Sequence, residues 1–155
     1  MKQTVQMEKI QANMAPGVIT LSGFLGDDLR KLIDILIADE ETVTLMGLSH
    51  DQIASRMIEL RDAGVRGLGD FINVVPHFEV KVDSVRGKLP CPFGDPGVFP
   101  KTNTTVKNLK TGKEVTFTDL NIHMILAHGF YQGRGSLFRL DPEFLAEVTE
   151  VEKTE

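Results

Sequence analysis

The segment TDLNIHMILAHGFYQGRGS, residues 118–136, constrains the fold more than any other part of the chain. Asp119 suits the first turn of a helix, and Gly129 is the residue type that ends helices in the left-handed conformation, so we expect a helix that ends near His128. Apolar residues lie around almost its whole circumference, which indicates a helix buried on most sides. We therefore expect His123 and His128 to be partly buried, so that their ring nitrogens need a hydrogen bond or a metal ion.

The other patterns along the chain predict an α+β fold. Residues 77–85 alternate apolar and polar side chains, as in a strand with one face in water. A hairpin follows, with strands at 102–109 and 114–118 and a turn that Gly112 can form. A further strand is expected at 18–25. The fold class is therefore a single α+β domain, in which a small antiparallel sheet of about three to four strands is packed by three to four helices.

Three further helices are predicted from apolar spacing and capping residues. The first covers residues 29–38, where leucine and isoleucine recur at the i, i+3, i+4 and i+7 positions. The second begins at Ser49, whose capping box is completed by Gln52, and ends at Gly64. The third begins at Asp141 and packs through one apolar face. The residues of that face are Phe144, Leu145 and Val148.

The domain limits follow from turn signals and charge. We expect residues 1–16 to form a loose N-terminal arm, which ends at a turn signal of alanine, proline and glycine. Residues 17–150 then form one domain, because 41% of the chain is apolar and this length supports one core. Residues 151–155 are expected to form an acidic C-terminal tail.

The distribution of charge argues against nucleic acid as a partner. The formal net charge is −5, and residues 141–155 hold six acids against one lysine, so the remaining 140 residues are neutral. A protein that follows a phosphate backbone needs a basic face, and none stands out here.

Cysteine usage and hydropathy indicate the compartment. The chain has a single cysteine, which excludes an internal disulfide and fits a reducing environment. No apolar run approaches the ~20 residues that a membrane span requires, and residues 1–11 lack the apolar core of a signal peptide. We therefore expect a cytoplasmic protein with no membrane association.

Three groups of residues could carry chemistry, and the first is a metal site. Cys91 lies in a proline-rich loop, His123 and His128 lie on the central helix, and Asp95 or His77 supplies a fourth ligand. A hairpin followed by a helix with two histidines resembles a zinc-finger unit in its order, although the second cysteine of such a unit is missing. Thiolate and imidazole ligands favour zinc. On an ideal helix the two histidines point about 140° apart, so we expect the last turn to tighten if both bind one ion.

The second group is nucleophilic. Cys91 would act as a thiolate, with His123 or His128 as its base and Asp95 or Asp119 to orient that base. No local motif of a known cysteine enzyme surrounds Cys91, and a lone cysteine is more often a small buried apolar residue.

The third group is a loop that could bind an anion. Residues 129–136 contain three glycines besides Arg134, and their backbone amides could hold a phosphate or carboxylate. In the alternative interpretation the glycines only allow the chain to turn.

A short stretch, GLSHDQIA at residues 47–54, resembles the second helix of a bacterial helix-turn-helix. That resemblance implies a DNA-binding regulator with a turn and a recognition helix after it. The predicted helix instead continues to residue 63 and is followed by VRGLGD, which departs from the motif.

These observations favour a non-enzymatic cytoplasmic domain that binds a zinc-like ion and acts through protein contacts or regulation. The proposed ligands are Cys91, Asp95, His123 and His128. A small thiol-dependent enzyme is the first alternative, and a helix-turn-helix regulator is the second. The sequence does not distinguish a monomer from a homo-oligomer.

Overall fold

The alternating strand predicted from residue 77 forms the centre of a four-stranded antiparallel sheet. This strand, β2, spans Phe78–Pro90 and pairs with β1, Ile72–Val74, on one side and with β3, Val98–Asn108, on the other. β4, Lys113–Thr118, completes the order β1-β2-β3-β4. The structure is a computed structural model that describes residues 2–153, and it confirms the α+β class and the size of the sheet.

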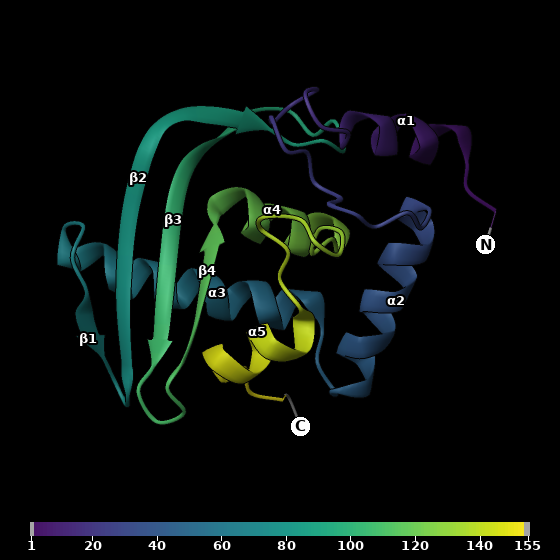
Figure 1. Ribbon diagram of the computed structural model, residues 1–155. Coiled ribbons are helices and arrows are strands. Elements are labelled where there is room, and N and C mark those ends of the chain that lie inside the picture. Colours follow the sequence, from purple (N-terminus) through teal and green to yellow (C-terminus); the bar gives the residue numbers. More distant parts are fainter. Residues whose placement is uncertain (1, 154–155) are drawn as a thin grey trace.

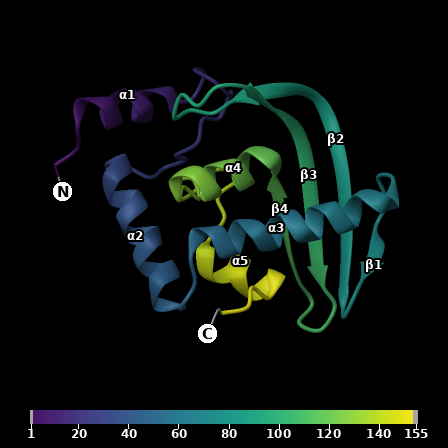
Figure 2. The ribbon, with the colours of Figure 1, turned by 180° about the vertical axis from the view of Figure 1, so that it is seen from behind.

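Three helices pack on one face of this sheet (Figures 1 and 2). They are α3, His50–Gly64, α4, Asp119–His128, and α5, Pro142–Thr149. α3 begins with the predicted capping box, and a Cβ on Gly64 would lie 2.4 Å from Val80, so the missing side chain lets α3 lie close to the sheet. The core between these elements is formed by buried apolar side chains, among them Met57, Leu60, Phe78, Val106, Phe117, Ile125, Leu145 and Val148.

A second, smaller core lies beneath the N-terminal helices and contains Cys91. It is formed by Met14, Phe24, Leu32, Ile35, Cys91, Leu120, Met124 and Phe130. α4 contributes to both cores, which is why it is apolar on most sides. The proline-rich loop between β2 and β3 reaches this second core because both strands bend over α4 at that end (Figure 1).

The loose arm expected over residues 1–16 is instead a helix. α1 spans Val5–Asn13, and Thr4 caps it by accepting a hydrogen bond from the backbone of Met7. Its Met7 and Ile10 pack against the second core, and Met14 is fully buried. The sequence prediction was wrong because a nine-residue helix with so short an apolar stripe is stable only when packed.

The helix predicted at 29–38 is displaced toward the C-terminus. α2 spans Leu32–Leu45, and Leu29 is 98% exposed. The free amides of its first turn, on Leu32 and Ile33, donate to the side chains of Gln11 and Gln3. Gln11 of α1 and Gln3 just before it therefore cap α2 with side chains that are remote in sequence, a contact that local patterns do not contain.

Two smaller expectations also differ from the structure. The strand expected at 18–25 is a loop with turns, in which Gly23 has a φ of +71° and Phe24 donates its amide to Met14. In α5, Leu145 and Val148 are buried as predicted, but Phe144 is 38% exposed. Of the acidic tail, residues 154–155 lie outside the described part, and Val151–Lys153 has no regular structure.

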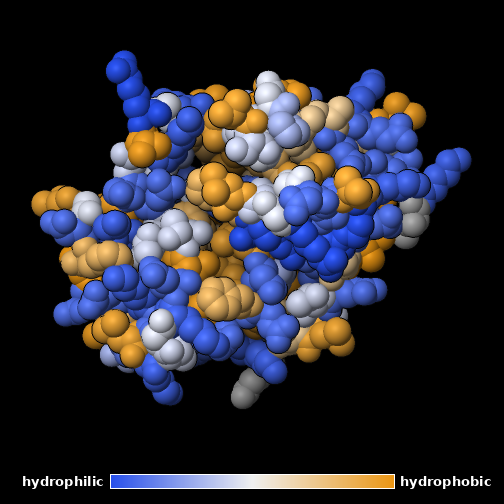
Figure 3. All heavy atoms as spheres, viewed as in Figure 1, coloured by the Kyte–Doolittle hydropathy of each residue, from blue (hydrophilic) through white to orange (hydrophobic). Residues whose placement is uncertain are grey.

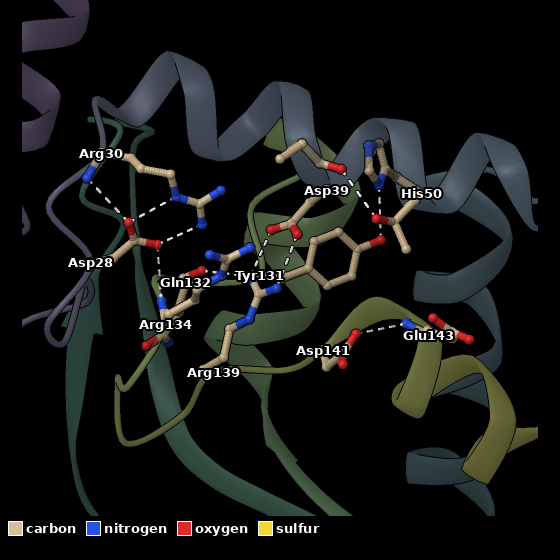
Figure 4. A network of polar contacts seen from close by, with 12 residues as sticks. Asp28, Arg30, Asp39, His50, Tyr131, Gln132, Arg134, Arg139, Asp141 and Glu143 are labelled. Carbon is tan, nitrogen blue, oxygen red and sulfur yellow. Dashed lines mark hydrogen bonds and ion pairs between the residues drawn. The ribbon is translucent and has the colours of Figure 1, made fainter.

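A buried polar network joins α2 and α3 to the segment after α4 (Figure 4). The guanidinium of Arg139 donates two hydrogen bonds to Asp39, with N–O distances of 2.6 and 3.0 Å. It also donates to the backbone oxygen of Gln132. The hydroxyl of the fully buried Tyr131 lies 2.8 Å from Nδ1 of His50. These contacts hold residues 129–140 against both helices.

Residues 129–136 cross closely over the segment before α2, and we therefore expect Gly133→Ala to destabilise the fold. A Cβ at this position would lie 2.3 Å from the backbone oxygen of Leu25, and backbone can move away only at high cost. We expect a loss of about 3 kcal/mol in the free energy of unfolding, measured by urea denaturation. Gly112→Ala is the matched control, because that Cβ meets nothing within 4 Å and costs only the strain of a positive φ. Equal losses in the two variants would contradict the close crossing.

Candidate metal centre

The loop between β2 and β3 brings two of the predicted ligands to the two histidines of α4. Cys91 opens this loop directly after β2, and Asp95 lies four residues later. The Nε2 atoms of His123 and His128 lie 2.7 Å and 2.6 Å from the same oxygen, Oδ2 of Asp95. The sulfur of Cys91 lies 3.8 Å from that oxygen. The four potential ligand atoms all lie within 4.8 Å of one another.

The two histidines meet without the tightened last turn that the sequence suggested. Gly129 has a φ of +63° and donates its amide to Ile125, as in a helix that ends with a left-handed glycine, while Phe130 donates to Met124. Both imidazole rings nevertheless reach the same carboxylate oxygen, with ring centroids 5.8 Å apart and nearly perpendicular planes. On an ideal helix the two histidine side chains would leave the backbone about 140° apart. Their length therefore lets both ring nitrogens reach one oxygen in spite of this angle.

Two phenylalanines hold the imidazole rings. Phe93 stacks on His128 with ring centroids 3.9 Å apart and planes 6° from parallel. Phe99 lies on His123 at 4.4 Å. Sequence reasoning missed both, although a phenylalanine within the proline-rich loop and another just after it were a visible signal. The stacking restricts the rings to orientations in which their Nε2 atoms face Asp95.

The loop itself is anchored to the N-terminal helix. The side-chain amide of Asn13, at the end of α1, donates to the backbone oxygen of Pro92. Within the loop, the amide of Gly94 donates to the backbone oxygen of Cys91. Gly94 and Gly97 flank Asp95 with φ values of +90° and +93°, and a Cβ on either would meet nothing within 4 Å. Asp95 thus lies on a turn that has room to adjust.

The electrostatics of the cluster differ for its acid and its thiol. Hydrogen bonds from His128 and, second, from His123 hold the pKa of the Asp95 carboxyl below its usual value. Burial raises the pKa of the Cys91 thiol, and the negative charge of Asp95 acts in the same direction. In the absence of a cation the carboxylate is therefore ionised and the thiol is protonated. A bound metal ion would instead favour the deprotonated form of Cys91, because the positive ion stabilises the thiolate.

Several alternatives from the sequence are not supported by this geometry. His77, the other fourth ligand considered, lies away from the cluster and pairs with Glu150 at 2.5 Å. Asp119, considered as an orienter, pairs with Arg61. Within residues 2–153 the thiol donates to Asp95, at 3.8 Å, rather than to a histidine, so the cluster does not have the arrangement of a cysteine–histidine pair.

The helix-turn-helix interpretation is wrong for this fold. α3 is followed by a single 3₁₀ turn, Val65–Gly67, and then by strand β1, so the position of the recognition helix is taken by the sheet. α3 also packs its apolar stripe into the main core.

The glycine-spaced loop also has a structural explanation. The amide of Gly133 donates to Phe24, and the amide of Arg134 donates to the carboxylate of Asp28. Two donors expected to hold an anion are therefore used within the protein, next to an acid that would repel one. Gly133 and Gly135 allow the close crossing described above.

In comparisons with known proteins, no protein-family model matches the chain, and neither a curated protein nor a solved structure has significant similarity to it. The functional argument therefore rests on the geometry of the cluster. Among the helices that the structure describes, none combines the length and apolarity that a bilayer crossing demands.

Proposed function

We propose that this chain is a small non-enzymatic domain that binds one zinc ion through Cys91, Asp95, His123 and His128. The observation that supports the proposal is the convergence of these four ligand atoms, from two segments about thirty residues apart, to within 4.8 Å. In this proposal the ion joins the loop between β2 and β3 to helix α4. It thereby ties the bent end of the sheet to the second core.

The ligand set favours zinc over other common ions. One thiolate, two imidazoles and one carboxylate combine soft and borderline ligands, whereas magnesium and calcium prefer oxygen alone. Ligand atoms in a tetrahedral zinc site lie about 3.3–3.8 Å apart. The two N–O distances of 2.6 and 2.7 Å must therefore open by about 0.7 Å, which the glycine-flanked turn at Asp95 permits.

The surroundings favour a structural ion over a catalytic one. Four protein ligands complete the tetrahedron, while catalytic zinc keeps one position for water or substrate. Cys91 is 4% exposed, and the rings of His123 and His128 are covered on one face by phenylalanines. A thiolate ligand also requires a reduced cysteine, which fits the proposed cytoplasmic location.

Metal analysis of the purified, tag-free chain tests the proposal. We expect about one equivalent of zinc, measured by plasma mass spectrometry, and less than about a tenth of that in Cys91→Ser and His123→Ala. His77→Ala is the matched control, because His77 pairs with Glu150 outside the cluster, and it should keep the metal. No metal in protein purified without chelators, or full loading of both ligand variants, would contradict the proposal.

The thiol-enzyme alternative predicts a different reactivity for the only cysteine of the chain. Because Cys91 is buried and its pKa is raised, we expect the native protein to react with iodoacetamide at neutral pH at least about tenfold more slowly than free cysteine. Mass spectrometry measures the labelled fraction over time. The urea-unfolded chain is the control and should react at the ordinary rate. Rapid labelling of the native protein would favour a thiol enzyme instead.

We also propose that the domain acts through contacts with a protein partner. Large apolar side chains reach the surface in several places (Figure 3), and Leu21, Leu29 and Leu68 are each more than 90% exposed. Where such side chains form a contiguous patch, they mark a surface at which proteins associate. Light scattering of the purified chain at two concentrations separates self-association from a monomer that needs a different partner.

A further inference from the structure

A pocket next to the candidate metal centre has the features of a binding site for a small molecule. Its volume is about 310 Å³, at the lower end of the range for ligand sites. Four parts of the fold contribute its walls: the loop before α2, strands β2 and β3 toward their bent end, the start of α4, and the chain after α4. The apolar side chains that line it include Phe24, Leu89, Phe99, Leu120, Leu137 and Phe138.

The first sign of a ligand is Gln132, which lines this pocket and is only 4% exposed. Its side-chain oxygen accepts a hydrogen bond of 2.6 Å from the hydroxyl of Ser136, which orients the amide. The amide nitrogen has no hydrogen-bond partner within residues 2–153. This nitrogen therefore has two N–H donors available to an acceptor in the pocket.

The backbone of Gln132 is also strained. Its φ is +71°, in the left-handed region that glycine occupies easily and glutamine does not. Arg139 holds this conformation by donating to the backbone oxygen of Gln132. Strain of this kind persists where the surrounding structure fixes a side chain in position, often at binding sites.

The second sign is the charge of the lining. Lys101 is the one charged residue among those that line the pocket, and no carboxylate within the described residues forms an ion pair with it. This is notable in a chain with a net charge of −5. Lys101 is partly exposed, so its aliphatic part can cover apolar surface while the ammonium group remains at the edge.

We propose that this pocket binds a medium-chain carboxylic acid. The aliphatic chain packs between Phe24, Leu89 and Leu120, and the carboxylate accepts hydrogen bonds from the amide of Gln132 and the ammonium group of Lys101. The donors and the single cation select a carboxylate over an amine. The volume accommodates one short chain and excludes a nucleotide-sized cofactor.

This proposal does not rest on the metal centre. None of the four candidate metal ligands lines the pocket, although Phe99 both lines it and stacks on His123. A ligand in the pocket therefore contacts the wall of the metal centre without contacting a ligand atom. Binding is measured on the protein as purified, with its metal content determined separately.

The test uses octanoate as the probe, with 1-octanol and octylamine as matched controls. Titrations are followed by amide chemical shifts of isotope-labelled protein. We expect saturable octanoate binding with shifts centred on residues 20–24, 99–103 and 132, and binding of octanol at least about tenfold weaker. Equal affinities for octanoate and octanol, tighter binding of octylamine, or no saturable shift from octanoate at millimolar concentration would each overturn the proposal.

Two variants separate the roles of the polar groups. Gln132→Glu keeps the side-chain shape and the oxygen that accepts from Ser136. It replaces the amide N–H donors with a carboxylate that repels the carboxylate of octanoate, so the affinity for octanoate should fall about tenfold or more. Lys101→Met keeps the aliphatic chain and removes the charge, with an expected loss of about fivefold. Lys101 is a partly exposed strand residue, so this variant should fold even if the first does not. If Lys101→Met bound octanoate with unchanged affinity, the proposed contact between the carboxylate and Lys101 would be overturned.

Discussion

Removing the metal from the purified chain with a chelator is expected to lower its melting temperature by about 10–15 °C. An ion present at about a thousand times its dissociation constant stabilises the native state by about 4 kcal/mol, because it binds the folded ligand cluster and not the unfolded chain. In a domain of this size each kcal/mol changes the melting temperature by about 2–4 °C. The loss should be large because the ion joins two segments that meet only in the folded protein.

Thermal melts followed by circular dichroism, before and after chelation, measure this effect. Addition of one equivalent of zinc should restore the original melting temperature. His77→Ala should show the same response as the unmodified chain, whereas Asp95→Ala should melt at the low temperature with or without chelator. Identical melting temperatures with and without the chelator would show that no structural ion is bound, and the pocket beside the cluster would then be the first site to examine.

Replacing Asp39 with alanine is expected to lower the free energy of unfolding by about 3–5 kcal/mol. Asp39 and Arg139 are 7% and 18% exposed at their side chains, and they form a two-bonded ion pair. The variant leaves the guanidinium in this site without its counter-charge, which is more costly than removing both charges. It also loosens the hold of Arg139 on the backbone of Gln132, which lines the pocket.

Urea denaturation measures this loss, and Glu40→Ala is the matched control. Glu40 is the next residue of the same helix and is exposed, so its replacement should change the stability by less than about 0.5 kcal/mol. A double variant, Asp39→Leu with Arg139→Met, should recover most of the loss because it removes both charges and keeps the volume. Similar stabilities for Asp39→Ala and Glu40→Ala would show that the pair contributes little.

The candidate ligand set was readable from the sequence because few side chains of this chain can bind a metal. The chain has one cysteine and four histidines, and two of these histidines lie on one strongly predicted helix. The choice between Asp95 and His77 could not be made from the sequence, because it depends on how β2 and β3 bend over α4. The stacking of Phe93 and Phe99 on the rings depends on the same bend.

Elements with local signals were predicted well, and elements held by distant contacts were not. The capping box of Ser49 and the glycine after His128 satisfy backbone groups a few residues away, so their helices begin and end as expected. α1 and the start of α2 depend on each other, since Gln3 and Gln11 cap the second helix. The sequence of either helix alone therefore does not reveal that α1 forms or where α2 begins.

The sequence by itself therefore determined the α+β class, the hairpin, the central helix and the residue types available for a metal site. Only the tertiary structure decided which of these residues meet. The ion pair of Asp39 with Arg139 joins two segments a hundred residues apart, and the pocket that Gln132 lines is built from segments that are similarly remote. The physical reason is that caps and apolar periodicity act over one or two turns, whereas the cluster, the pocket and the buried network form only where the packing of two cores brings remote segments together.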